Sequence, residues 1–364
     1  MTVQAATPTA QGHAPGLIDF VLPARLEAGS PPEERGSGRD DVRLMVSWRS
    51  SAGVEHRRFT DLPEILENGD LLVVNTSATL PAALRGRVGD RAALLHLSVP
   101  AGPHAWAVEL RHPQSDWRSS APWLDARPGT VVVLPEGGRA VLMSPVRSGP
   151  ALGDVRLWRA RLELPQLLDR YLADNGRPVR YGYVSSDRPI AAYQTVFAEE
   201  AGSAEMPSAA RPFTAELVTR LVSRGIGITP VLLHTGLSSQ EAHEAPMEER
   251  FAVPGPSAAR INATRRLGGR VIAVGTTVVR ALETVVDPHG VVLPGAGRTG
   301  LVVAPDRPVR SVDGMITGWH EPRASHLAMI EAVAGRHLLE VSYAAALEEG
   351  YLWHEFGDSQ LILP

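Results

Sequence analysis

The chain has 364 residues, of which 44% are hydrophobic, and a formal net charge of −4. This length is long for one domain and comfortable for two, and the apolar content supports a packed core. The absence of cysteine excludes disulfides, thiolate zinc sites and iron–sulfur clusters. All 36 basic residues are arginine, which excludes lysine Schiff-base catalysis and a P-loop lysine. No apolar run approaches the length of a membrane span, so a cytoplasmic protein without membrane contact is predicted.

The N-terminal region carries two segments that are expected to be disordered. Residues 1–16 have neither the basic start nor the apolar core of a signal peptide, so a disordered leader is predicted. The charged stretch 29–40, which is rich in Pro, Gly and Ser, favours disorder for the same reason. Strands are predicted at 42–48 and 71–74, with a helix start at 61–64 between them.

From residue 78 to 164 the pattern changes to short apolar runs between turn residues. These runs lie at 92–99, 105–110, 130–134, 140–143 and 156–162, a spacing that predicts a small antiparallel barrel. After Pro165 the pattern is helical at 167–174 and then of the α/β type, with a helix at 213–223, a strand at 226–233, a helix at 325–334 and a last apolar segment at 343–349. The predicted organisation is therefore an α/β domain (17–77 and 165–364) with an inserted small antiparallel β-barrel domain (78–164).

The stretch RVIAVGTTVVRALE, from Arg270 to Glu283, predicts a buried strand, a tight turn and a helix. A strand that ends in Gly-Thr-Thr and opens a helix directs free backbone N–H groups and the hydroxyls of Thr276 and Thr277 at whatever lies above it. Such a corner suits an anionic or strongly polar ligand. The alternative is an ordinary strand–helix corner with a threonine at the N-cap.

Two other patterns resemble functional motifs without fitting them. The glycines of 295–300 match a dinucleotide-binding pattern, but a strand-like run follows them instead of a helix, so a hairpin turn is predicted. The 12 histidines lack zinc-ligand spacing, and no metal site is expected.

Five segments then stand in the order found in one enzyme family. They are 61–75 (DLP…GDLLVVN), 193–198 (YQTVFA), 275–283 (GTTVVRALE), 312–329 (VDGMITGWHEPRASHLAM) and 351–362 (YLWHEFGDSQLI). From about residue 19 to 363 the chain resembles the QueA family, S-adenosylmethionine:tRNA ribosyltransferase-isomerase. The resemblance implies an α/β domain carrying a β-barrel, in agreement with the pattern of runs.

The chain departs from the pattern of that family in several motifs. Alanines 78 and 83 stand where the family usually has arginines, which would face a nucleic acid or a phosphate. The segments 207–213, 234–240, 318–320 and 357–360 also differ from the family pattern. Together these changes favour an altered acceptor.

The resemblance implies that S-adenosylmethionine is a co-substrate that donates its ribosyl group. A base removes a C5′ proton next to the sulfonium, adenine is expelled, and an amine takes the rearranged ribosyl group. His320, His234 and Asp358 are the implied acid–base groups, with His320 favoured because most of its motif is retained. The implied substrate-binding residues are Thr276, Thr277 and Arg280 for the methionine carboxylate or ribose hydroxyls, Glu283 to orient Arg280, and Tyr193 and Gln194 for a base.

Three functions follow as alternatives. The first is the family reaction on 7-aminomethyl-7-deazaguanine in tRNA, a step of queuosine biosynthesis that forms epoxyqueuosine. The second uses S-adenosylmethionine as ribosyl donor to a small molecule, and the third is a non-catalytic binding protein on the same fold. The net charge and the alanines at 78 and 83 favour a small molecule over tRNA as the acceptor. A monomer that binds S-adenosylmethionine without a metal is expected.

Overall fold

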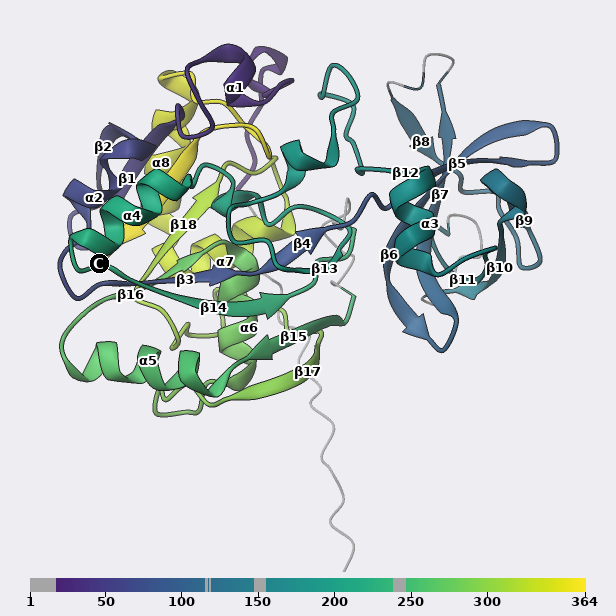
Figure 1. Cartoon of the computed structure of the whole chain (residues 1–364). Helices are drawn as coiled ribbons and strands as arrows, with labels where there is room; N and C mark the ends of the chain where they lie inside the picture. The colour runs from purple at the N-terminus through teal and green to yellow at the C-terminus, as the bar shows by residue number, and fades with distance from the viewer. Residues whose placement is uncertain (1–17, 115–116, 118, 147–154, 238–246) are drawn as a thin grey trace, which may run out of the picture.

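The computed structural model describes residues 18–114, 117, 119–146, 155–237 and 247–364. The predicted leader, 1–16, lies outside the described residues. An α/β domain and a β-barrel lie side by side, and the chain passes between them near β4 (Ser77–Thr79) and β13 (Glu200–Ser203) (Figure 1). No helix in the described part of the chain is long and apolar enough to cross a membrane.

The α/β domain is built on a mixed sheet of nine strands. Their order is β17 (Gly295–Thr299), β15 (Glu249–Val253), β14 (Gly227–Leu233), β3 (Leu71–Asn75), β16 (Val271–Val274), β18 (Gly314–Gly318), β19 (Ser359–Leu363), β1 (Arg43–Trp48) and β2 (Gly53–Arg58). The four central strands, β14, β3, β16 and β18, run parallel, so their carboxyl ends meet at one edge of the sheet.

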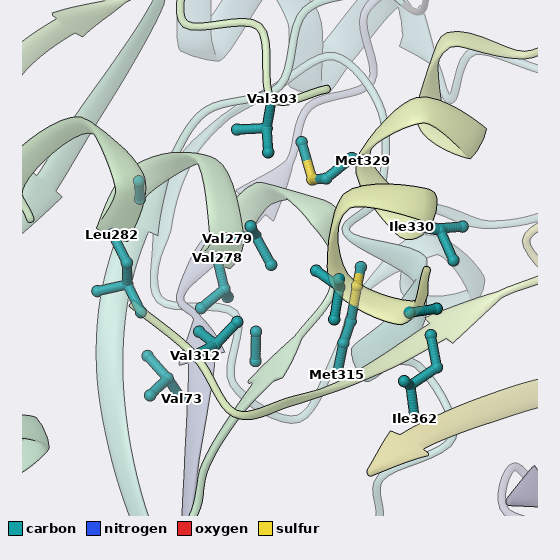
Figure 2. Packing of buried hydrophobic residues seen from close by; sticks show 14 of the residues in the cluster. Val73, Val278, Val279, Leu282, Val303, Val312, Met315, Met329, Ile330 and Ile362 are labelled. Atoms are coloured by element: carbon teal, nitrogen blue, oxygen red, sulfur yellow. The ribbon is translucent and has the colours of Figure 1, made fainter. Parts of the chain in front are cut away.

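Helices cover both faces of this sheet. The helices α5 (Gly255–Arg266), α6 (Thr276–Val285), α7 (Ser325–Ala334) and α8 (Arg336–Glu348) pack on one face, and α2 (Leu62–Ile65) and α4 (Ala215–Ser223) pack on the other. Side chains of β3 alternate between the two faces of the sheet. Leu71 and Val73 belong to the hydrophobic cluster under α5–α8, and Leu72 and Val74 belong to the cluster under α2 and α4. Figure 2 shows the first cluster, in which Val278 and Leu282 of α6 gather with Met329 of α7 over the sheet.

The inserted domain is a closed antiparallel barrel. Its ring is β5 (Ala83–Val88), β6 (Arg91–Gly102), β7 (Ala105–Pro113), β11 (Leu157–Glu163), β10 (Arg139–Pro145) and β9 (Val131–Val133). The short strands β8 (Ser120–Pro122) and β12 (Gly176–Arg177) pair with β7 and β5, and α3 (Leu168–Asn175) adds Tyr171 and Leu172 to the barrel core. The predicted fold class, α/β with an inserted small β-barrel, is therefore confirmed.

Two sequence predictions about local structure were wrong. The stretch 295–299 is not a hairpin turn but the edge strand β17, which pairs antiparallel with β15 over its whole length. The helix at 325–334, which was predicted to be the final one, is followed by a further helix, α8, over Arg336–Glu348. Short 3-10 helices connect other elements, at Ala24–Leu26, Phe59–Asp61, Pro135–Gly137, Ile190–Tyr193 and Ser208–Ala210.

The stretch 29–40 is folded, contrary to the prediction of disorder. It contains α1 (Pro32–Arg35), and both carboxylate oxygens of Glu33 accept hydrogen bonds of 3.0 Å from Arg211. Arg211 is only 1% exposed, and it also donates to the carbonyl of Ala192. A buried guanidinium needs a partner, and the composition of 29–40 could not reveal one that lies so far along the chain.

We expect Glu33→Gln to lower the free energy of unfolding by about 1–3 kcal/mol, because it leaves the buried Arg211 without a charged partner. Burial raises the pKa of Glu33, but its hydrogen bonds and the charge of Arg211 outweigh burial and leave the pKa below its ordinary value of 4.5. The stabilisation is therefore full above pH 4.5 and is lost as the pH falls through the lowered value. Urea denaturation at several pH values measures it.

The matched control for this variant is Glu64→Gln, which breaks only exposed ion pairs with Arg220 and Arg224. Exposed pairs contribute little, so this variant should unfold close to wild type. Equal effects of the two substitutions would contradict a special role for the Glu33–Arg211 pair.

Candidate functional site

A cavity of about 450 Å³ lies between the barrel and the carboxyl ends of the parallel strands. Its lining includes Thr235 and Gly236 after β14, the turn Gly275–Thr277 after β16, and the segment 318–321 after β18. The barrel side contributes Arg156 and Leu157. In open α/β sheets ligands bind at this edge of the strands, so the cavity is the leading candidate site.

The Gly-Thr-Thr corner faces the cavity as the sequence predicted. Gly275, and not a threonine, stands at the N-cap of α6, with a φ of +100° that favours glycine. Thr276 and Thr277 follow as the first helical residues and line the cavity, and Asn75 donates to the hydroxyl of Thr277 at 3.2 Å. The first N–H groups of a helix have no partner within it, so this end of α6 can receive an anion.

Arg280 lines the cavity one turn into α6, and its charged partner is not the one predicted. Its Nη1 pairs with the carboxylate of Glu249 in β15, which also accepts the N–H of Gly236. The Nε of Arg280 is buried without a hydrogen-bond partner. Glu283 does not contact Arg280 in any of these pairs; its carboxylate accepts the N–H groups of Arg310 and Ser311.

Three histidines line the cavity wall, and burial lowers the pKa of each. His320 has its Nε2 3.2 Å from the hydroxyl of Thr317, and its ring is parallel to that of His326, with 4.6 Å between centroids. Burial, followed by the charges of His326 and His354, holds the pKa of His320 well below its ordinary value. Burial lowers the pKa of His326 and of His354 to about 4. All three rings are therefore neutral at neutral pH.

A stack of rings with two carboxylates forms another part of the lining. The ring of Tyr183 lies between that of Tyr181, 5.8 Å away, and that of His354, 3.8 Å away. Tyr181 donates its hydroxyl proton to Glu205, and Tyr183 donates to Glu355 at 2.5 Å. None of these residues was predicted from the sequence, although the Tyr-x-Tyr spacing at 181–183 could have placed both rings on one side of an extended segment.

His354, which stacks on Tyr183, has a strained backbone. Its φ is +74°, a left-handed conformation that costs energy for any residue other than glycine. Strain of this kind is concentrated at functional sites, where the surrounding structure imposes it.

The other predicted residues divide between the cavity and its supports. Tyr193 lines the cavity. The side-chain amide of Gln194 instead binds the backbone N–H and carbonyl of Thr79, at 2.9 and 2.8 Å. Asp358 is buried away from the cavity and accepts the N–H groups of Arg43 and Leu352, at 2.8 and 2.7 Å. Gln194 and Asp358 thus hold the backbone around the site.

His234 lies next to the lining residue Thr235, but its own ring is not part of the lining. Its Nδ1 is 2.7 Å from the hydroxyl of Ser77, and its Nε2 is 3.0 Å from Arg250. Burial, followed by the charge of Arg250, lowers the pKa of His234. Ser77 is fully buried, so this serine–histidine pair does not present a nucleophile to a substrate.

The two alanines that replace expected arginines lie in different surroundings. Ala78 is half-buried in β4, and Ala83 is only 6% exposed within the barrel core, opposite His96 of β6. Position 83 therefore points into the packed barrel and is almost completely shielded from solvent. Among the described residues no group of His, Cys, Asp and Glu side chains is arranged to hold a metal.

Comparison with known proteins places these features in context. A family profile described as "Queuosine biosynthesis protein" matches residues 17–362. Proteins named S-adenosylmethionine:tRNA ribosyltransferase-isomerase from Heliobacterium modesticaldum and Symbiobacterium thermophilum are each 37% identical to this chain. Both alignments cover 95% of this chain, and they cover 99% and 98% of the two relatives.

The fold is also similar to that of a solved structure. The crystal structure of S-adenosylmethionine tRNA ribosyltransferase from Thermotoga maritima matches with a TM-score of 0.51 and 28% identity. The match covers 95% of this chain and 99% of that chain. The similarity therefore extends over both the α/β domain and the barrel.

Proposed function

We propose that this chain, which belongs to the queuosine biosynthesis protein family, is an S-adenosylmethionine-dependent ribosyltransferase-isomerase. It moves the ribosyl moiety of S-adenosylmethionine to a 7-aminomethyl-7-deazaguanine base in tRNA and releases adenine and methionine. A tRNA substrate would place the enzyme in the cytoplasm. The observation that carries the proposal is the cavity at the carboxyl ends of the parallel strands, where a helix N-terminus and an arginine face a wall of rings and carboxylates.

Different groups of the lining can bind the different charged parts of S-adenosylmethionine. The N-terminus of α6, the hydroxyls of Thr276 and Thr277, and Arg280 suit the methionine carboxylate. The ring of Tyr181, which Tyr183 covers on one face only, suits the sulfonium, because a cation is attracted to the face of an aromatic ring. The neutral ring of His320 can form a hydrogen bond with the departing adenine.

The proposed reaction is tested by incubating the protein with S-adenosylmethionine, alone and with tRNA that carries the acceptor base. Mass spectrometry then follows adenine, methionine and the mass of the modified base. Release of adenine and methionine together with a base of increased mass would support the proposal. Release of neither product under any condition would exclude it.

A second candidate acceptor is a small amine, and the charge of the cavity favours it. In the described part of the lining, the carboxylates Glu205, Glu249, Glu321 and Glu355 outnumber the guanidinium groups Arg156 and Arg280, while the buried histidines are neutral. A negative cavity in a chain of net charge −4 attracts a small cation and repels phosphates. The same assay with primary amines in place of tRNA separates the two acceptors.

We expect bulk tRNA without the acceptor base to bind weakly and to lose nearly all affinity at physiological salt. Few phosphates would be neutralised by a protein of this charge, and affinity for nucleic acid depends on their number. Fluorescence titration at several salt concentrations measures both affinity and slope. Tight binding with a steep negative slope would instead point to an arginine surface, such as the group Arg85, Arg177 and Arg180 around Asp187.

A further inference from the structure

We propose that Glu355, oriented by the hydroxyl of Tyr183, is the proton-transfer residue of the cavity. Its carboxylate removes a proton from C5′ of S-adenosylmethionine, next to the sulfonium, and later returns a proton to the departing adenine. The assignment rests on the proposed function and names the residue that performs its acid–base step.

Glu355 has the position that this role requires. It lines the cavity directly after His354, whose strained backbone turns the chain at this point. Tyr183 donates to one carboxylate oxygen, Oε2, at 2.5 Å, which fixes the carboxylate at the cavity lining. Tyr183 is itself held between two parallel rings, so the donor is rigid. A rigid hydrogen-bond donor preorganises a base.

The surroundings of Glu355 adjust its basicity to neutral pH. Burial raises its pKa to about 7; the hydrogen bond from Tyr183 opposes this shift, the charge of Glu205 adds to it, and the charge of Arg211 opposes it. An acid–base catalyst works best when its pKa is near the operating pH. The titratable and charged groups that face it are Tyr181, Tyr183, Tyr193, Glu205, Arg211 and His354.

The histidines and Glu249 of the described lining suit the step less well. The histidines have lowered pKa values, about 4 for His326 and His354, so they are weak bases at neutral pH. Glu249 is bound by Arg280 and by the N–H of Gly236. Glu205 accepts the hydroxyl of Tyr181 as Glu355 accepts that of Tyr183, so this contact alone does not separate the two carboxylates. Glu355 thus combines access to the cavity, orientation and a suitable pKa.

The step is balanced through one proton. The C5′–H bond breaks, an O–H bond forms on Glu355, and the electron pair stays on C5′, where the adjacent sulfonium stabilises it. The C5′ electron pair then forms a C4′=C5′ double bond as the C4′–O4′ bond breaks, and O4′ becomes a carbonyl oxygen on C1′. The bond from C1′ to adenine breaks at the same time, its electron pair goes to the leaving nitrogen, and this nitrogen receives the proton from Glu355. The carboxylate is then restored, and no oxidant, reductant or metal is consumed.

The test compares wild type with Glu355→Gln, Glu355→Asp, Tyr183→Phe and the exposed control Glu348→Gln. Adenine release is measured from pH 5.5 to 9 with S-adenosylmethionine and the acceptor, together with S-adenosylmethionine binding by calorimetry. Wild-type kcat should rise with pH through about 7 as Glu355 ionises. Glu355→Gln should lower kcat by about 10²–10⁴-fold and lose this dependence, while binding changes little. Glu355→Asp should recover part of the rate.

Two readouts separate catalysis from structure. Because the hydrogen bond from Tyr183 lowers the pKa of Glu355, Tyr183→Phe should move the rise in rate to higher pH. The folded protein also holds the proton of Glu355 more tightly than the unfolded chain does, so ionisation above pH 7 costs stability. Glu355→Gln should therefore melt no lower than wild type at pH 8, despite its loss of activity.

The possible outcomes distinguish the role of Glu355 from the proposed function of the protein. An active wild type whose rate and pH profile are shared by Glu355→Gln would overturn the role of Glu355 and leave the proposed function standing. Loss of rate in parallel with loss of melting temperature, and no shift in Tyr183→Phe, would make Glu355 structural and overturn the inference. A wild type that binds S-adenosylmethionine but never releases adenine would overturn the proposed function, and the assignment of Glu355 with it.

Discussion

Arg280→Ala is expected to weaken S-adenosylmethionine binding by about ten- to a hundred-fold, roughly 1.5–3 kcal/mol. Arg280 lines the cavity beside the N-terminus of α6, and its Nε is buried without a hydrogen-bond partner. A ligand carboxylate can supply that partner through a charge-assisted hydrogen bond. Calorimetry of the wild type and the variant measures the difference.

The matched control is Arg266→Ala, which removes an exposed arginine from α5 and leaves the cavity intact. It should bind S-adenosylmethionine as wild type does. Because Arg280 also neutralises the buried Glu249, the melting temperature of each variant must be recorded on the same preparation. A variant that melts lower but binds S-adenosylmethionine unchanged would show that Arg280 serves Glu249 alone.

Local patterns accounted for much of the fold and for one side of the cavity. The strand–turn–helix corner at 271–285 followed from apolar periodicity and from a glycine between the two elements, because both features are encoded within fifteen residues. The barrel followed from short apolar runs at regular spacing, which alternation and turn residues determine locally.

The other side of the cavity depends on contacts between distant segments, which no local pattern encodes. Tyr183 and Glu355 meet across 172 positions of the chain, and Arg211 meets Glu33 across 178. The residues of a motif can also be needed for folding. A Cβ atom at Gly357 would lie 2.3 Å from the carbonyl oxygen of Leu352, and the N–H of the same Leu352 donates to the carboxylate of Asp358. Motif position alone therefore could not distinguish Asp358 as a support from Glu355 as a lining residue.

The two acid–base candidates predict different kinetic behaviour. His320 was favoured from its motif, but desolvation of this ring, which stacks on His326, holds its pKa well below the ordinary value and keeps the ring neutral near pH 7. A neutral imidazole can donate a hydrogen bond to a leaving group without changing its own charge, and removing one such preorganised donor costs about 10²–10³ in rate. Glu355, in contrast, changes its charge within the assay range.

We therefore expect His320→Gln to lower kcat by about 10²–10³-fold while the pH profile keeps its wild-type shape. Donor binding should change little, and the exposed control His337→Gln should match wild type in every measurement. The competing role for His320 is structural, since its carbonyl accepts a hydrogen bond from Trp353 and its Nε2 contacts Thr317. In that case the variant would melt at a lower temperature while its folded fraction kept near-normal turnover. A variant that lost the pH dependence itself would identify His320, and not Glu355, as the group that carries the proton.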